Sequence, residues 1–144
     1  QKALIEGLLD GTIDCIATDH APHSHEEKNQ SFVDSPFGIV GSEYAFQMIY
    51  THFVKTGVFT LEQVVDWMAI KPAEIFGLNA GRLTIGGPAD LAIFDLETEY
   101  VVDDQQFLSK SINTPFVGWK LYGDTTVTLV DGKIAWKKKV GNNR

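Results

Sequence analysis

Residues 13–23 read IDCIATDHAPH, and they set the architecture that we expect for this chain. The apolar run 13–17 has the length and composition of a short buried strand. A carboxylate, Asp19, and two imidazoles, His20 and His23, follow it directly. In (β/α) barrels, the loops at the carboxyl ends of the strands converge on one mouth, where catalysis takes place. We therefore expect residues 13–17 to form a barrel strand whose polar tip carries the chemistry.

The composition is that of a globular protein without a basic surface. The chain has 144 residues, the length of one domain, with 44% hydrophobic and 22% charged residues. Its net charge of −7 argues against nucleic acid and anionic membranes as partners, because both attract basic proteins. No apolar run approaches the length of about 18 residues that a membrane span needs. The single cysteine, Cys15, leaves no intramolecular disulfide, so we expect a cytoplasmic protein.

The first block, residues 2–36, predicts a helix, the strand and a long loop. The chain begins without Met and enters an apolar helical pattern at once, with no capping residue before it. We therefore expect the sequence to be part of a longer protein. The polar stretch 20–36 is predicted to be a loop, and a loop of this length beside a compact barrel is usually functional.

The second block is helical. Apolar residues recur at helical spacing over 44–54, and this pattern ends at Gly57. Thr60 and Gln63 form the signature of a capping box, which predicts that a second helix starts there. We expect Pro72 to interrupt this helix before a final turn that ends at Gly77.

The third block changes to short strands. Residues 91–94 and 100–102 are predicted strands, and 126–136 is a predicted hairpin with Asp131-Gly132 in a type I′ turn. We place the boundary near 78–86, which gives two units, residues 1–80 and 81–144. We expect neither unit to be complete, because one strand cannot form a barrel and a few strands cannot close a sandwich.

Several short motifs are distributed along the chain: Asp14–His23, Glu26–Lys28, Pro36–Glu43, Lys71–Leu78, Gly81–Leu91, Ser111–Gly118 and Val130–Lys133. Together they resemble the dihydroorotase family of the amidohydrolase superfamily, whose members are metal-dependent (β/α)8 hydrolases. The resemblance implies an α/β fold. Residues 1–80 would supply the last strand and helices of a TIM barrel, and 81–144 the C-terminal part of a small β-sandwich.

The resemblance also implies that much of the active site lies outside this chain. Full-length relatives are about three times as long, so the chain would be their C-terminal third. The family's His-x-His motif, its bridging ligand, two further histidines and a substrate-binding asparagine have no counterpart here. We therefore expect that this chain needs the N-terminal part of the barrel to hold zinc, one or two ions per site, and that it is inactive alone.

Roles for individual residues follow from the same resemblance. Asp19 would be a zinc ligand and the general base toward the attacking water, and then the general acid toward the ring nitrogen. His23 would bind the substrate carboxylate, and His20 would orient the loop or Asp19. Phe37 and Gly38 would offer backbone groups to the substrate ring. From the residues alone, Asp19 could be a turn cap, His23 an exposed loop residue and 37–38 a simple turn.

Three functions are compatible with these motifs. The first is a zinc-dependent dihydroorotase, which interconverts dihydroorotate and N-carbamoyl-L-aspartate in pyrimidine (UMP) synthesis. The second is a hydantoinase, dihydropyrimidinase or allantoinase, although His23 favours an acidic substrate. The third is an inactive scaffold with aspartate transcarbamoylase as its partner, against which the presence of Asp19 and His23 argues. We expect a small-molecule substrate and a homodimer.

Overall fold

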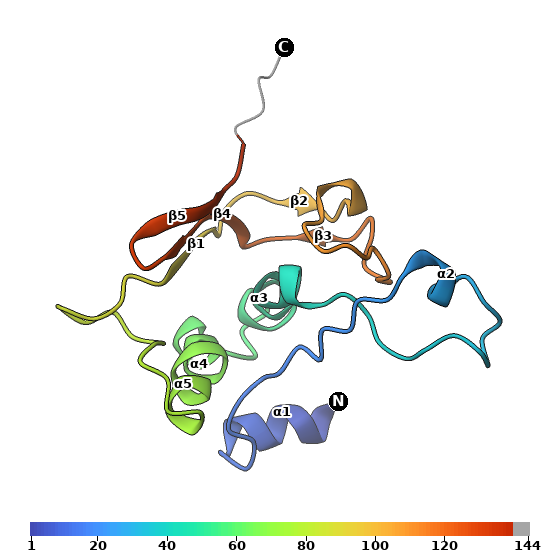
Figure 1. The fold of residues 1–144 in the computed structure, drawn as a ribbon. Helices are drawn as coiled ribbons and strands as arrows, with labels where there is room; N and C mark the ends of the chain where they lie inside the picture. The colour runs from blue at the N-terminus through green and yellow to red at the C-terminus, as the bar shows by residue number, and fades with distance from the viewer. Residues whose placement is uncertain (140–144) are drawn as a thin grey trace.

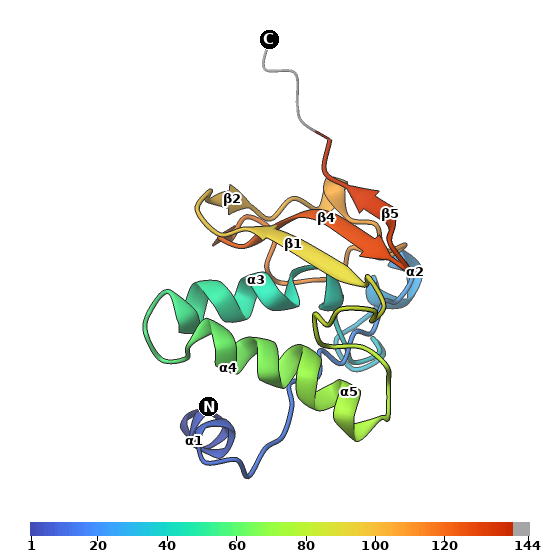
Figure 2. The ribbon, with the colours of Figure 1, turned by 90° about the vertical axis from the view of Figure 1, so that its left-hand side faces the viewer.

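Three helical layers lie beneath a small antiparallel sheet. The computed structural model describes residues 1–139, so the last five residues of the predicted unit 81–144 lie outside it. Figures 1 and 2 show the sheet above helix α3, the rod containing α4 and α5 below α3, and α1 at the bottom. The helices before the sheet are α1 (Lys2–Leu9), α2 (His25–Lys28), η1 (Ser42–Tyr44), α3 (Ala45–Ile49), η2 (Tyr50–Val54), α4 (Leu61–Val65), η3 (Asp66–Ile70) and α5 (Lys71–Ile75).

The two central helices form where the sequence predicts them. α3 continues into the π-helical η2, and Gly57 at φ +76° follows the end of the helix. The capping box of Thr60 and Gln63 is present at the start of α4. The predicted interruption at Pro72 was wrong, because α4, η3 and α5 run on as one rod. Hydrogen bonding changes to the π pattern in η3, and Pro72 lies in the first turn of α5, where its missing N–H costs little.

The predicted strands after residue 90 are confirmed. β1 (Leu91–Asp95), β4 (Asp124–Val130) and β5 (Lys133–Lys137) form an antiparallel sheet in the order β1-β4-β5. Asp131 at φ +50° and Gly132 at φ +73° make the predicted I′ hairpin turn. The remaining elements are β2 (Tyr100–Val101), which pairs with β3 (Lys120–Leu121), and η4 (Asp104–Gln106).

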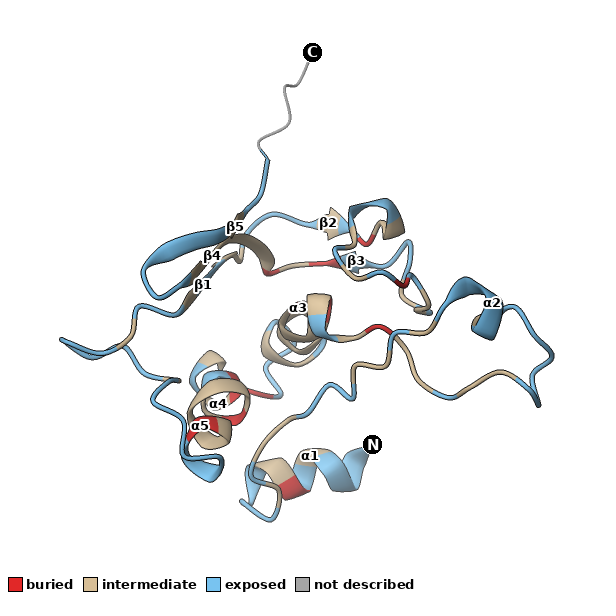
Figure 3. Cartoon of the chain, in the orientation of Figure 1, coloured by how far each residue is buried: buried red, intermediate tan, exposed pale blue. Residues whose placement is uncertain are grey.

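Two hydrophobic clusters hold the layers together. Phe59, Val64 and Trp67 are buried between the rod and neighbouring helices, and Ile16 packs against them. Val40 packs in a second cluster, which joins the loop before η1 to strands β2 and β3. Figure 3 shows buried residues between the layers, while α2 and the outer face of the hairpin are exposed. No helix of residues 1–139 is both long and apolar enough to cross a membrane.

The first 40 residues differ from the sequence prediction in two places. Residues 13–17 form no strand, since their backbone has only two scattered bonds to the rest of the described chain: Ile13 N–H donates to Gly7 O at 2.8 Å, and Ile16 N–H donates to Trp67 O at 3.1 Å. A strand requires a paired neighbour, and within residues 1–139 this segment has none, so the described chain does not form a barrel. The predicted loop 20–36 contains α2, whose capping box joins Ser24 and Glu27.

Candidate active site

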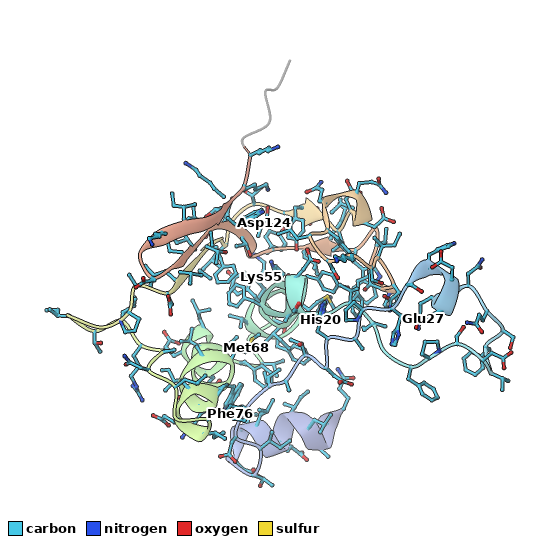
Figure 4. All side chains as sticks on the ribbon, in the orientation of Figure 1. His20, Glu27, Lys55, Met68, Phe76 and Asp124 are labelled. Carbon is cyan, nitrogen blue, oxygen red and sulfur yellow. The ribbon has the colours of Figure 1, made fainter. Side chains whose placement is uncertain are left out.

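Three segments that are far apart in the sequence meet around His20: residues 18–23, 36–42 and 111–113. His20 and Ile39 form an isolated parallel bridge, and Ala21 N–H donates to Ile39 O at 2.9 Å. Val40 N–H donates to the carbonyl oxygen of Asn113 at 2.9 Å. Figure 4 places His20 between α3 and the long loop that carries α2. The predicted site residues are thus brought to one place by backbone pairing between loops.

Asp19 occupies an unusual backbone conformation. Its φ is +47°, and the only other non-glycine residue with positive φ among residues 1–139 is Asp131 of the hairpin turn. The side chain is exposed and forms no hydrogen bond or ion pair within the described chain. No turn hydrogen bond accounts for the conformation of Asp19. Backbone strain of this kind concentrates at functional sites, so an exposed carboxylate here is a candidate for chemistry.

His20 holds the loop that leads into η1. Its Nδ1 accepts hydrogen bonds from the backbone N–H groups of Gly41 at 3.1 Å and Ser42 at 3.3 Å. Because Nδ1 accepts both bonds, it carries no proton in this arrangement. The ring is half-buried, and within the described residues it does not bond to Asp19. The contacts of His20 therefore orient the loop 41–42.

His23 makes three polar contacts, two through its ring and one through its backbone. Its Nε2 lies 2.9 Å from the carbonyl oxygen of Phe37, and its Nδ1 lies 3.7 Å from Oε2 of Glu27. Its backbone N–H donates to Oδ1 of Asn113 at 3.3 Å. The backbone N–H of Ser24 holds the pKa of Glu27 below its usual value, and the His23 ring adds to this effect. Glu27 therefore stays charged beside the imidazole at neutral pH.

The carbonyl groups of residues 36–38 are all bonded to side chains. Lys28 Nζ donates to the carbonyl oxygens of Pro36 at 2.9 Å and Gly38 at 3.2 Å. Asn113 Nδ2 also donates to Gly38 O, at 3.1 Å. The N–H groups of Phe37 and Gly38 have no acceptor among residues 1–139, which leaves two neighbouring donors for a ligand.

Only glycine fits at residue 38. Its φ is +111°, a conformation that L side chains rarely adopt, and an added Cβ would lie 2.4 Å from Cβ of Ala21. Phe37 beside it is 95% exposed. This close approach keeps the Phe37-Gly38 peptide against the segment that carries His23.

Sequence reasoning missed Lys28 and Asn113. The motif ranges 26–28 and 111–118 contain them, but no role in the site was predicted for either residue. The contacts of Asn113 span up to 90 residues, so no local pattern could identify it, whereas those of Lys28 span only 8 and 10 residues. The spacing of Ser24 and Glu27, by contrast, is a capping-box signal that could have predicted α2, and with it the position of Lys28.

The Asp19 carboxylate could supply one ligand of a zinc site that also needs other protein ligands. An exposed carboxylate is a hard oxygen donor of the kind that zinc accepts. Catalytic zinc sites use three protein ligands, and residues 1–139 contain no group of three or more histidine, cysteine or acidic side chains that could hold a metal. Any zinc centre would therefore need ligands beyond those that the described chain brings together.

A separate cavity of about 410 Å³ lies between η1, α3 and the sheet. Tyr44, Tyr100 and Asp124 line it, and it contains none of the predicted site residues. Burial raises the pKa of the Tyr100 hydroxyl above its usual value. We locate the candidate site at the loops instead, because the exposed carboxylate of Asp19, the His23 imidazole and the two open N–H donors all belong to these loops.

Comparisons with known proteins agree with the resemblance seen in the sequence. The chain is 68% identical over 139 residues to a dihydroorotase from Enterococcus faecalis and 62% identical over 138 residues to one from Bacillus caldolyticus. Each alignment covers 96% of this chain and 33% or 32% of the relative. The chain thus spans about a third of the length of the curated relatives that it matches.

Solved structures give the same fold. A D-hydantoinase (dihydropyrimidinase) from Thermus sp. matches 99% of the chain with 30% identity and a TM-score of 0.86, and the match covers 32% of that structure's chain. An L-hydantoinase from Arthrobacter aurescens matches 94% with 36% identity and a TM-score of 0.84, covering 31% of its chain. The amidohydrolase family model matches residues 1–135. The chain belongs to the amidohydrolase family.

Proposed function

We propose that this chain is the carboxyl-terminal third of a zinc-dependent dihydroorotase. The whole protein would reversibly hydrolyse (S)-dihydroorotate to N-carbamoyl-L-aspartate in pyrimidine synthesis, in the cytoplasm and as a homodimer. Residues 1–80 would belong to its barrel and 81–144 to its β-sandwich, and the chain alone would be inactive. The observation that carries this proposal is an exposed carboxylate without a partner, Asp19, four residues before His23, whose ring bonds to the carbonyl group of Phe37 beside two N–H groups that have no acceptor among residues 1–139.

Asp19 is proposed as the proton carrier and as a zinc ligand. Zinc, when bound, lowers the pKa of a water molecule to about 7 and so makes a nucleophile available at neutral pH. The carboxylate of Asp19 takes the proton from the attacking water and delivers it to the ring nitrogen as the amide C–N bond breaks. Its exposure and lack of a partner support this role, because a carboxylate held in an ion pair would be a weaker base.

His23 and the loop 37–38 are proposed to bind the substrate. The Nδ1 side of the His23 ring has only the long 3.7 Å contact to Glu27, so a substrate carboxylate can compete for this side when both ring nitrogens carry a proton and donate. The N–H groups of Phe37 and Gly38 suit the carbonyl oxygens of a flat cyclic amide. His20 would keep the loop in place through its bonds to Gly41 and Ser42.

A hydantoinase or dihydropyrimidinase is the second candidate. The observation that favours it is the structural match to hydantoinases, with TM-scores of 0.86 and 0.84. Such enzymes act on rings without a carboxylate, so His23 separates the two candidates. An imidazole can bind the carboxylate of an acidic substrate, whereas a neutral ring offers no carboxylate to bind.

The test is turnover by the full-length protein in the presence of zinc. Dihydroorotate, hydantoin and dihydrouracil are offered at equal concentrations, and ring opening is followed for each. Turnover of dihydroorotate far above the two neutral rings supports the proposal. Preference for a neutral ring assigns the chain to the second candidate, and the absence of any turnover contradicts both.

A further inference from the structure

Asn113 joins the two segments on which the proposed substrate site depends. Its Oδ1 accepts the backbone N–H of His23 at 3.3 Å, and its Nδ2 donates to the carbonyl oxygen of Gly38 at 3.1 Å. These two partners lie 90 and 75 residues earlier in the chain. One half-buried amide therefore connects the carboxylate-binding histidine with the loop that offers the N–H donors.

The orientation of this amide is itself fixed. The hydroxyl of Ser111, a buried residue, donates to Oδ1 of Asn113, and the backbone N–H of Asn113 lies 3.4 Å from the Ser111 oxygen. Because Oδ1 already accepts from the Ser111 hydroxyl and from His23 N–H, the amide nitrogen must face Gly38. A flipped amide would place its nitrogen against the N–H donor of His23 and its oxygen against the carbonyl oxygen of Gly38.

The bonds to the carbonyl groups also set the direction of the open N–H donors. In a trans peptide, the N–H points opposite to the carbonyl oxygen of the preceding residue. Lys28 holds the Pro36 oxygen and His23 holds the Phe37 oxygen, so the N–H groups of Phe37 and Gly38 must point away from these side chains. Asn113 and Lys28 together hold the next oxygen, that of Gly38.

We propose that Asn113 is a positioning residue that sets the distance between His23 and the N–H donors of Phe37 and Gly38. This inference rests on the function proposed above. It adds that selectivity for a ring carrying a carboxylate depends on Asn113, because such a substrate must reach both groups at once. A neutral ring needs only the N–H donors and is less sensitive to their distance from His23.

The test is steady-state kinetics of the full-length protein with Asn113→Ala. Two lost hydrogen bonds predict a rise of about tenfold or more in KM for dihydroorotate, with kcat within about threefold. The KM for dihydrouracil should change less. Asn79→Ala is the matched control, because Asn79 is exposed and makes no side-chain hydrogen bond within residues 1–139.

A second readout does not depend on activity. Without substrate, hydrogen exchange of the segment 37–41 should be faster in Asn113→Ala than in wild type or Asn79→Ala. If Asn113→Ala does not fold, Ser111→Ala takes its place, with an expected rise of about threefold in KM and faster exchange of the same segment.

The outcomes separate the two proposals. Normal turnover of dihydroorotate by wild type, together with an unchanged KM in the folded variant, overturns the role of Asn113 and leaves the function standing. If wild type does not turn over dihydroorotate, the function fails. Hydrogen exchange of the segment 37–41 in Asn113→Ala then tests whether Asn113 positions the loop. Faster exchange than in wild type supports the positioning role, and unchanged exchange overturns it.

Discussion

Residues 13–19 and the loop 36–41 are both irregular and converge at the bridge between His20 and Ile39, but they are held very differently. The loop has three successive carbonyl groups bonded to side chains, and its Val40 N–H is bonded to Asn113. Residues 13–19 have backbone bonds from Ile13 to Gly7 and from Ile16 to Trp67, no side-chain bond at Asp19, and end in that exposed carboxylate. The proposed binding surface is thus fixed by contacts within this chain, whereas the proposed catalytic carboxylate is left available.

The largest expected effect is that of Asp19→Asn. An amide cannot carry the proton and is a poorer zinc ligand, so we expect kcat of the full-length protein to fall by a factor on the order of 10²–10⁴. The thermal unfolding midpoint should hardly change, because Asp19 has no partner within residues 1–139. Asp14→Asn, an exposed carboxylate on the same segment, should leave kcat intact. Near-normal turnover by Asp19→Asn would exclude it as the proton carrier.

Gly38→Ala should damage the binding loop. The positive φ costs about 1–3 kcal/mol for a residue with a side chain, and the overlap with Ala21 adds to that cost. We expect the free energy of unfolding to fall and KM for dihydroorotate to rise by about tenfold or more. The control is Gly57→Ala, which has a positive φ but no atom within 4 Å of the added Cβ. Gly57→Ala should cost about 1 kcal/mol and leave KM unchanged. Equal effects of the two variants would contradict the close packing at Gly38.

His23→Ala should weaken binding of the acidic substrate. Loss of a charge-assisted hydrogen bond predicts a rise of about tenfold to a hundredfold in KM for dihydroorotate, with a smaller change for dihydrouracil. The exposed neighbour His25 provides the control, since His25→Ala should change neither the KM for dihydroorotate nor the KM for dihydrouracil. An equal rise for both substrates would mean that His23 only holds the Phe37 carbonyl group.

The smallest effects are expected at the two capping boxes. Thr60→Ala should lower the free energy of unfolding by about 1 kcal/mol, because α4 carries the buried Val64. Ser24→Ala should leave global stability nearly unchanged, since α2 has no buried residue, but it should raise KM about twofold to threefold by loosening Lys28. Urea unfolding and steady-state kinetics of both variants test this. A loss of stability without a change in KM in Ser24→Ala would argue against a role of α2 in binding.

Local features were predictable from the sequence, and long-range ones were not. The Asp131-Gly132 turn and the Thr60 cap depend on neighbours within four residues, and the structure confirms both. Residues 13–17 have the composition of a strand, but strand formation depends on pairing partners, which the described chain does not supply. Asn113 reaches partners up to 90 residues away, so nothing in its local sequence marks it. For Asp19, His23 and the loop 37–38, the structure adds their positions to the roles that the resemblance implied.

The most direct measurement is a crystal structure of the full-length Asp19→Asn protein with zinc and dihydroorotate, in which slow turnover preserves the substrate. We expect the substrate carboxylate within hydrogen-bond distance of the His23 ring and the ring amide on the N–H groups of Phe37 and Gly38, with residue 19 facing the scissile bond. Dihydroorotate bound elsewhere, for example in the cavity lined by Tyr44 and Tyr100, would contradict the proposed site.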